Sequence, residues 1–402
     1  MLEGNRSMKI SDAVKYVGVN DHAIDLFEGH FHVHLGMAYN SYVILDDKIA
    51  VMDSVDGRFG DEWLLNIKKE LGGREPDYLV VQHMEMDHSA CIQQFIRAYP
   101  KAVIAASKMA FTMLKSYFGD EFAAAIAPRQ LAVGEGSTLE LGTHSLQFIA
   151  APNVHWPEVL MSYEKLEKIL FSADAFGKFG ANDKEDPEGW TCEARRYYFG
   201  IVGKFGPQVQ AVLKKAAGLD IQKICPLHGP VLDADIAEYL RLYGIWSDYG
   251  VESEGVMIAY TSVYGNTRNA VEKLTGLLEA RGCPKVVVAD LAREDMYENV
   301  ENAFRYGTLV LASTTYNGGV FPAMREFIEH LTERNYQKRK IAFVENGSWA
   351  PAAAKAMRSL FDKGLEAGCK DLSFAESKVS IKIAMSDKNL QEMEALAREL
   401  LA

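Results

Sequence analysis

Two histidines and two carboxylates fall within six residues of the segment Val81-Gln82-His83-Met84-Glu85-Met86-Asp87-His88-Ser89. Such polar side chains beside apolar residues are costly to bury without compensation, which argues against an ordinary surface loop. In an extended segment alternate side chains point the same way, so His83, Glu85 and Asp87 are expected to share one side. His88 then turns to the other side. One short loop is therefore predicted to serve two metal ions.

Three further ligand-type residues stand at the ends of other β-like runs. They are His155 before Trp156-Pro157, Asp174 after residues 170–173, and His228 within residues 226–230. Taken alone, each is more readily a turn or capping residue than a ligand. With the loop they make four neutral imidazoles and three carboxylates, a donor set that favours iron or manganese over zinc. A bridging hydroxide would bring the set to about four negative charges, which balance two divalent ions and favour the reduced state.

This spacing resembles the H-x-H-x-D-H motif of the metallo-β-lactamase superfamily, with Glu85 in place of the second histidine. That variant is characteristic of the flavodiiron proteins. The segments His-Trp-Pro-Glu from His155, Ser-Ala-Asp-Ala-Phe-Gly around Asp174 and Leu-His-Gly-Pro around His228 are similar to the family's counterparts. The resemblance implies one iron on His83, Glu85 and His155, the other on Asp87, His88 and His228, and Asp174 with a hydroxide or oxo group as bridges.

Periodicity divides the chain into two halves. The first has β-like runs at 41–45, 49–52, 78–81, 146–150 and 169–171, and helical segments at 63–71 and 91–99, the latter with Ser89 as expected N-cap. In the second, strands at 256–260, 285–289, 309–312 and 341–344 alternate with helices such as 269–281, and the polar segment 251–255 marks the seam. With the resemblance, the expected fold class is α/β and α+β in two domains: a metallo-β-lactamase-like αββα sandwich at 1–252 and a flavodoxin-like doubly wound parallel sheet at 253–402.

Three polar loops follow strands of the second half, at the carboxyl edge where open α/β sheets bind their ligands. The first precedes a helix, whose N–H groups can bind a phosphate without a cationic residue, although such turns are also ordinary capping devices. Tyr316 and Trp349 either cover an isoalloxazine ring or serve in packing. The loops look like those of a flavodoxin, which implies FMN contacts from Thr261, Ser262, Val263, Tyr264, Gly265, Asn266, Thr267, Ser313, Thr314, Thr315, Tyr316, Asn317, Gly318, Gly319, Asn346, Gly347, Ser348 and Trp349.

Missing motifs and the composition argue against several other cofactors and partners. No G-x-G-x-x-G follows a strand and no G-x-x-x-x-G-K-[ST] occurs, which favours FMN over a dinucleotide. The 5 cysteines form no C-x-x-C pair, which argues against iron–sulfur clusters and indicates a reducing cytoplasm. With 43 Lys and Arg against 55 Asp and Glu, nucleic acid is not an expected partner, and no apolar run of about 18 residues predicts a membrane span. Residues 1–7, before Met8, are expected to be a cloning remnant.

Zinc cannot accept electrons, so a zinc hydrolase could not use the electrons of a fused flavodoxin. The fusion therefore implies a redox-active metal. Electrons from an external donor are expected to pass through FMN to the irons, where four reduce O2 to water or two couple two NO molecules to N2O. The sequence does not choose between O2 and NO. The family resemblance implies a separate rubredoxin as donor, with a deazaflavin as another possibility, and a head-to-tail homodimer or dimer of dimers. A dizinc hydrolase with a flavodoxin-like regulatory domain and a non-catalytic gas or redox sensor are the alternatives.

The sequence does not decide the roles of two groups of side chains that are expected near the metal centre. Tyr197 or Tyr198 is a candidate proton donor, and Tyr198 is the predicted catalytic residue, although an aromatic pair on a helix is more often core. His30, His32 and His34 alternate along an expected strand. They either lie over the open metal positions or face solvent.

Overall fold

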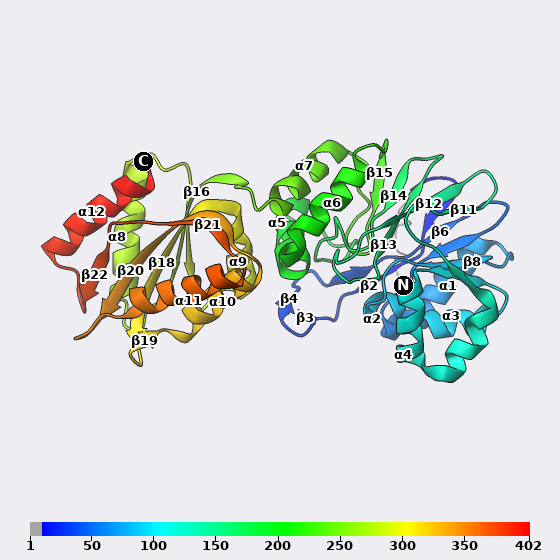
Figure 1. The fold of residues 1–402 in the computed structure, drawn as a ribbon, viewed down its shortest axis with the longest axis horizontal. Helices are drawn as coiled ribbons and strands as arrows, with labels where there is room; N and C mark the ends of the chain where they lie inside the picture. Colours follow the sequence, from blue (N-terminus) through cyan, green and yellow to red (C-terminus); the bar gives the residue numbers. More distant parts are fainter. Residues whose placement is uncertain (1–9) are drawn as a thin grey trace. The chain divides into compact units, whose positions relative to one another are not determined.

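The computed structural model describes residues 10–402, which form two compact units that divide between Gly244 and Ile245 (Figure 1). The predicted boundary, between residues 252 and 253, lies a short way further along, after helix α7 (Ile236–Ser247). The predicted cloning remnant lies outside the described residues. None of the described helices is both long and apolar enough to cross a membrane.

The first unit contains two large β-sheets. One has six strands in the order β1-β6-β7-β8-β9-β10, and the other has five in the order β11-β12-β13-β14-β15. Their bounds are Val14–Tyr16 (β1), Tyr42–Ile44 (β6), Ala50–Met52 (β7), Tyr78–Val81 (β8), Val103–Ala106 (β9), Gln130–Ala132 (β10), Thr138–Glu140 (β11), Ser145–Ala150 (β12), Leu160–Glu164 (β13), Ile169–Phe171 (β14) and Lys223–Cys225 (β15). Side chains from both sheets, among them Tyr42, Ile44, Phe148 and Phe171, share one buried cluster, so the sheets pack face to face.

Helices cover the outer faces of this sandwich. α4 packs against β9 of one sheet and α6 against β12 of the other, which gives the predicted αββα layering. The remaining bounds are Gly60–Leu71 (α1), Met86–Ser89 (α2), Ile92–Ala98 (α3), Lys108–Ile126 (α4), Trp190–Tyr197 (α5) and Gly206–Ala216 (α6), with short turns Gly57–Phe59 (η1), Ala127–Arg129 (η2), Tyr198–Val202 (η3) and Gly203–Phe205 (η4). Two small two-stranded sheets pair Val19–Asp21 (β2) with Met37–Tyr39 (β5) and Leu26–Phe27 (β3) with Phe31–His32 (β4).

The sequence predicts some of the strands that position the ligand-type residues but not β15, which precedes His228. β8 and β14 match their predicted bounds at both ends. β7, β8 and β9 run parallel and are almost wholly buried, which explains why their sequences are continuous apolar runs without alternation. Because parallel strands end at the same edge of a sheet, the loops after β7 and β8 lie next to each other.

The second unit is a single twisted sheet flanked by helices. Its strands run in the order β17-β16-β18-β20-β21, all parallel, and this order, 2-1-3-4-5, is typical of the flavodoxin-like sheet that the sequence predicts. Their bounds are Ser253–Tyr260 (β16), Val286–Asp290 (β17), Tyr306–Tyr316 (β18), Gln337–Gly347 (β20) and Lys370–Phe374 (β21), with Gly319–Val320 (β19) and Val379–Lys382 (β22) paired beside them. The helices are Asn266–Ala280 (α8), Met296–Arg305 (α9), Pro322–Glu333 (α10), Ala353–Ala367 (α11) and Asp387–Leu400 (α12).

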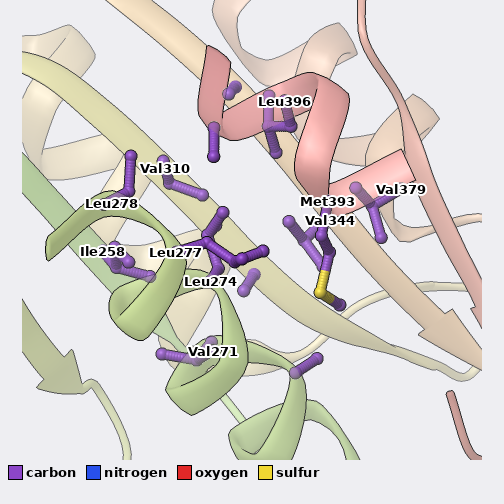
Figure 2. Close-up of a cluster of buried hydrophobic side chains, with 14 of the residues drawn as sticks. Ile258, Val271, Leu274, Leu277, Leu278, Val310, Val344, Val379, Met393 and Leu396 are labelled. Carbon is purple, nitrogen blue, oxygen red and sulfur yellow. The ribbon is translucent and has the colours of Figure 1, made fainter. Parts of the chain in front are cut away.

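One face of this sheet is covered by α8 and α12. Figure 2 shows Leu274 of α8 and Met393 of α12 among the buried side chains that meet Ile258, Val310 and Val344 on the strands. Burying such side chains contributes about 1.5–3 kcal/mol each. This core holds the sheet while the loops at its carboxyl edge stay open to solvent.

Candidate metal centre and flavin cleft

The loop after β8 is not extended, which corrects the predicted alternation of its side chains. Residues 86–89 form the single helical turn α2, with Glu85 as the N-cap residue. Asp87 and His88 are therefore about 100° apart around a helical turn rather than on opposite sides of a strand. The prediction that Ser89 caps the next helix is also wrong, because α3 begins at Ile92 after Cys91. The Ser89 hydroxyl instead donates to the carbonyl oxygen of Met84 at 2.9 Å and so closes the ligand loop.

A first group of ligand-type atoms comes from His83, Glu85, His155 and Asp174. Nε2 of His155 lies 3.1 Å from Oε2 of Glu85 and 3.0 Å from Oδ2 of Asp174. Nε2 of His83 lies 3.3 Å from the same Glu85 oxygen and 3.4 Å from the same Asp174 oxygen. Three separate loops thus bring four side chains to one point.

A second group comes from Asp87, His88 and His228. The Nε2 atoms of His88 and His228 are 3.0 Å apart, and Oδ2 of Asp87 lies 3.3 Å from each. Oδ1 of Asp174 lies 3.5 Å from Nε2 of His88 and 3.9 Å from Nε2 of His228. The Asp174 carboxylate therefore lies between the two groups with one oxygen toward each, and all seven predicted side chains are brought together.

The hydrogen bonds around the cluster leave its lone pairs pointing inward. Nδ1 of His228 lies 2.8 Å from the carbonyl oxygen of Ala38, an acceptor only, so this nitrogen donates and Nε2 keeps its lone pair. Both carboxylate oxygens of Asp87 and Oδ1 of Asp174 are buried without a hydrogen-bond partner among the described residues. Converging nitrogen and oxygen lone pairs without a thiolate fit hard or borderline metal ions such as iron and manganese.

The pKa values in the cluster show the same need for positive charge. Burial disfavours the charged form of His155, but hydrogen bonds to Asp174 and Glu85 raise its pKa to about 9. Burial lowers the pKa of His88 to about 4, so this imidazole stays neutral. The histidines hold the pKa of Asp174 well below its usual range despite the opposing effect of burial. Without metal, protons must offset the buried carboxylates, whereas metal ions supply that positive charge themselves.

Two buried carboxylates outside the predicted ligand set hold the loop after β8. Oε1 of Glu158 lies 2.9 Å from Nδ1 of His83 and accepts the backbone N–H of Met84 at 2.8 Å. Oδ1 of Asp53 accepts the N–H groups of Gln82 and His83 at 2.7 and 3.3 Å. Asp53 follows β7, and only the pairing of β7 with β8 brings it there, so no local signal identifies it. Glu158, by contrast, could have been identified from the sequence, because it is the last residue of the His-Trp-Pro-Glu segment.

The loop that carries His228 is held by Asn40, which sequence reasoning also missed. The buried side chain of Asn40 donates from Nδ2 to the carbonyl oxygens of Pro226 at 2.9 Å and Gly229 at 2.7 Å. Its backbone N–H donates to the carbonyl oxygen of Leu227 at 2.8 Å. Three hydrogen bonds from one residue thus bracket His228 on both sides.

Of the two candidate tyrosines, Tyr197 lies beside the cluster. Its ring centroid is 5.5 Å from that of His228, and its hydroxyl is buried without a hydrogen-bond partner among the described residues. Burial, and then the charge of Asp174, raises the pKa of Tyr197 well above its ordinary value, so the phenol keeps its proton. The ring of Tyr198 packs instead against Tyr243 at 5.2 Å. The ring contacts therefore favour Tyr197 over Tyr198, the predicted catalytic residue, as the candidate proton donor.

The three alternating histidines face solvent. β4 is only two residues long, so no longer strand carries them, and the exposed rings of His32 and His34 stack 5.9 Å apart. His30 is also exposed, with Nε2 4.0 Å from Oε2 of Glu28. Glu28, which the sequence did not single out, is the member of this hairpin that interacts with Glu85. Burial, followed by the charge of Glu85, raises the pKa of Glu28 to about 7.

The three polar loops of the second unit line one cleft. Ten predicted flavin contacts lie in it, together with the unpredicted Ile383: Ser262, Val263, Tyr264, Asn266, Thr267, Thr314, Thr315, Asn346, Gly347 and Ser348. The side chain of Asn346 holds Ile383 there, because Nδ2 donates to its carbonyl oxygen at 2.9 Å and Oδ1 accepts its N–H at 3.1 Å. The two residues are far apart in sequence, so no motif marks Ile383.

The other predicted flavin residues lie beneath or around the cleft. The Thr261 and Ser313 hydroxyls are buried 3.1 Å apart, Asn317 and Gly318 form the turn between β18 and β19, and Gly319 is the first residue of β19. Tyr316 and Trp349 remain 45% and 85% exposed.

The cleft also contains the start of helix α8. Gly265 is its N-cap residue with φ 88°, and its N–H donates to the hydroxyl of Ser262 at 3.1 Å. Glycine adopts this left-handed conformation without strain. A helix N-terminus flanked by hydroxyl groups fits a phosphate monoester such as that of FMN.

Fold and site together define a two-domain protein in which a lactamase-type sandwich with paired metal-ligand groups is joined to a flavodoxin-type sheet. The family described as ODP family beta lactamase matches residues 37–229, and the flavodoxin domain family matches residues 257–380. The occurrence of both matches in one chain supports its assignment to the flavodiiron protein family.

Named relatives are similar over nearly the whole chain. A nitric oxide reductase of Moorella thermoacetica is 28% identical and covers 99% of both chains. An anaerobic nitric oxide reductase flavorubredoxin of Aeromonas hydrophila is 27% identical over 90% of this chain and 74% of its own length. Among solved structures, the flavodiiron protein from Giardia intestinalis superposes with a TM-score of 0.89 at 25% identity, covering 100% of this chain and 98% of the other. The rubredoxin oxygen:oxidoreductase of Desulfovibrio gigas shares the fold with a TM-score of 0.88 at 23% identity, over 98% of each chain.

Proposed function

We propose that this chain is a flavodiiron oxidoreductase that takes electrons from an external donor through FMN to a two-iron centre. There it reduces O2 to water, NO to N2O, or both. The observation that carries the proposal is the shared position of Asp174, whose two oxygens face two separate sets of histidine and carboxylate ligands. Relatives named nitric oxide reductase support it.

The ligands are proposed to divide as the two groups do. His83, Glu85 and His155 hold one iron, Asp87, His88 and His228 hold the other, and Asp174 bridges them. When bound, the two irons supply electrons to a diatomic substrate. O2 needs four electrons and four protons to give two waters, whereas two NO molecules need two electrons and two protons to give N2O and one water.

The protein must also deliver protons to the reduced substrate. Tyr197 is proposed as the donor, because its ring lies 5.5 Å from that of His228 and its buried hydroxyl has no hydrogen-bond partner among the described residues. A positioned acid typically contributes about 10²–10⁴-fold to a rate. The ring of Phe27, 5.5 Å from that of His228, adds apolar surface that limits bulk water on this side.

The second unit is proposed to bind FMN. The N-terminus of α8 and the hydroxyl-rich loop at residues 261–267 would receive its phosphate, and the exposed rings of Tyr264 and Trp349 stand beside the cleft for the isoalloxazine. The helix dipole and the N–H and hydroxyl groups of this loop would hold the phosphate.

A head-to-tail homodimer, or a dimer of dimers, and a rubredoxin-like donor complete the proposal by family resemblance. Tyr264 is 93% and Trp349 85% exposed, which is apolar surface of the kind that a second copy would cover. The wide spacing of the five cysteines supports a cytoplasmic location and an electron donor on another chain.

The decisive experiment mixes the fully reduced, anaerobic protein with O2 and with NO in turn in a stopped-flow instrument, and measures turnover and product. Yellow protein with about two irons per chain and rapid reoxidation by either gas supports the proposal. A colourless protein holding only zinc would instead support the dizinc hydrolase, which the carboxylate-rich donor set does not favour. Iron and flavin without turnover would point to a sensor.

A further inference from the structure

The two ligand groups differ in the hydrogen-bond partners of their histidine Nδ1 atoms. Nδ1 of His83 lies 2.9 Å from the carboxylate of Glu158, whose side chain is 0% exposed. Nδ1 of His228 faces a neutral acceptor, the carbonyl oxygen of Ala38. Nδ1 of His88 is buried without a hydrogen-bond partner among the described residues. A carboxylate raises the basicity of a metal-bound imidazole more than a carbonyl group does, so His83 is the strongest donor of the three.

The Glu158 side chain is held through one of its two carboxylate oxygens. Its Oε1 lies 2.9 Å from Nδ1 of His83 and accepts the backbone N–H of Met84 at 2.8 Å. Oε2 is buried without a hydrogen-bond partner among the described residues. Two contacts to one oxygen therefore fix the carboxylate against the ring of His83.

The position of the Glu158 carboxylate makes the surroundings of the two metal positions unequal. Glu85 and Asp87 contribute one carboxylate to each position, and Asp174 is shared between them. Glu158 adds a further carboxylate on the His83 side only. An additional negative charge close by stabilises the more highly charged state of a metal ion in a low-dielectric interior.

We propose that Glu158 is a positioning residue that makes the His83 position the low-potential half of the pair. With iron bound, the ion that His83, Glu85 and His155 would hold would be the first of the pair to give up an electron, before the ion that Asp87, His88 and His228 would hold. The electron passes to the oxidant, no covalent bond forms or breaks, and one electron from the reduced flavin restores the starting state. The inference rests on the proposed function and adds an order of oxidation to it.

Glu158→Gln separates charge from shape. The amide is similar in size and its oxygen still accepts the N–H groups of His83 and Met84, so only the charge is lost. Glu158→Ala removes both the charge and the acceptor. Glu164→Gln is the matched control, because Glu164 is a buried carboxylate of the same unit that accepts the backbone N–H groups of Leu166 and Glu167 at 2.9 and 2.6 Å, within its own turn.

The test uses full-length holoprotein loaded with ⁵⁷Fe, poised anaerobically at a series of potentials and frozen for Mössbauer spectroscopy, which counts ferrous and ferric iron without interference from the flavin. The wild type should oxidise in two separate one-electron steps. In Glu158→Gln the lower step should move up toward an unchanged upper step, and the ferrous doublet altered by the substitution should be the one that oxidises first. Glu158→Ala should shift it in the same direction, and Glu164→Gln should match the wild type.

Several results would overturn this assignment. Both steps staying in place in Glu158→Gln, both moving equally, or only the upper one moving would each contradict it, as would a single two-electron step in the wild type. Loss of iron from Glu158→Gln also counts against it, since the amide retains the hydrogen bonds. Wild-type protein that binds no iron or fails to turn over would instead refute the proposed function itself.

Discussion

Asn40→Ala removes the side chain that holds the His228 loop. Four side-chain hydrogen bonds are lost: Nδ2 donates to the carbonyl oxygens of Pro226 and Gly229, and Oδ1 accepts from the Tyr16 hydroxyl and the Asn182 amide. The Pro226 oxygen keeps the hydroxyl of Tyr42 as a donor at 2.7 Å, whereas the Gly229 oxygen loses its side-chain donor. A buried unsatisfied carbonyl costs about 1–3 kcal/mol, and the vacated volume adds about 1 kcal/mol. The unfolding free energy of the first unit should therefore fall by about 2–4 kcal/mol.

The assay is a guanidinium titration of the full chain followed by circular dichroism, with flavin fluorescence reporting separately on the second unit. Iron affinity at the Asp87, His88 and His228 position should fall by about 10–100-fold, while the other position keeps its metal. Asn66→Ala is the control, because Asn66 makes a single partly buried hydrogen bond to Gly18 at 3.2 Å, and its loss should cost less than about 1 kcal/mol. An Asn40→Ala protein with a wild-type midpoint and two irons per chain would refute the reasoning.

Four further changes test separate parts of the molecule. Asp174→Asn replaces the shared carboxylate with a neutral amide and should lose iron but not FMN; full iron content by elemental analysis would remove Asp174 from the centre. Gly265→Val forces a branched side chain into φ 88° and should release FMN while iron stays, and loss of both cofactors together would argue against independent units. Tyr197→Phe should keep both cofactors but slow gas turnover by about 10²-fold or more, whereas Tyr198→Phe should stay near wild type; equal rates in the two variants would contradict the choice of Tyr197. His144 pairs with two carboxylates, which raise its pKa despite burial. A histidine whose pKa is raised on folding stabilises the fold fully below its pKa in the unfolded chain, about 6.5. This stabilisation is lost progressively as the pH rises through its pKa in the folded protein. His144→Gln should thus lower the denaturation midpoint more at about pH 5.5 than at about pH 9, and an equal loss at both would show that the charge of His144 does not matter.

The ligand types were predictable because their chemistry is local. Histidines and carboxylates at strand ends are visible in the sequence, and the structure brings all seven together. The conformation of the loop was not predictable from spacing, because the same four residues fit either an extended segment or the helical turn α2. The buried hydrogen bonds of Ser89 to Met84 and of Asp53 to Gln82 stabilise the turn, and the second of these depends on the pairing of β7 with β8.

The choice between Tyr197 and Tyr198 shows a different limit of sequence reasoning. α5 ends at Tyr197, and the following residues form the π-helical turn η3. A π turn inserts residues into the helical register, so the side chains on either side of it no longer follow a period of 3.6. Helical periodicity therefore cannot decide which of the two rings faces His228. Ile383 was missed for another reason, since a side-chain hydrogen bond to Asn346 from a distant loop brings it to the cleft.

The two sites lie on loops that follow strands, but they handle charge in opposite ways. In the flavin cleft, backbone N–H groups and neutral hydroxyls receive an anion, so an empty cleft leaves no uncompensated buried charge. In the metal centre, Asp174 and Asp87 are buried carboxylates whose ion pairs, within the described part of the chain, involve only histidines. Ligand binding stabilises the native state by an amount that grows with the logarithm of the free ligand concentration relative to its Kd, and at the metal centre it also removes the electrostatic cost of these carboxylates. The stability of the first unit should therefore depend on its metal far more than the stability of the second depends on its flavin. Because the two sites belong to different units, iron loss and FMN loss can be separated by single substitutions.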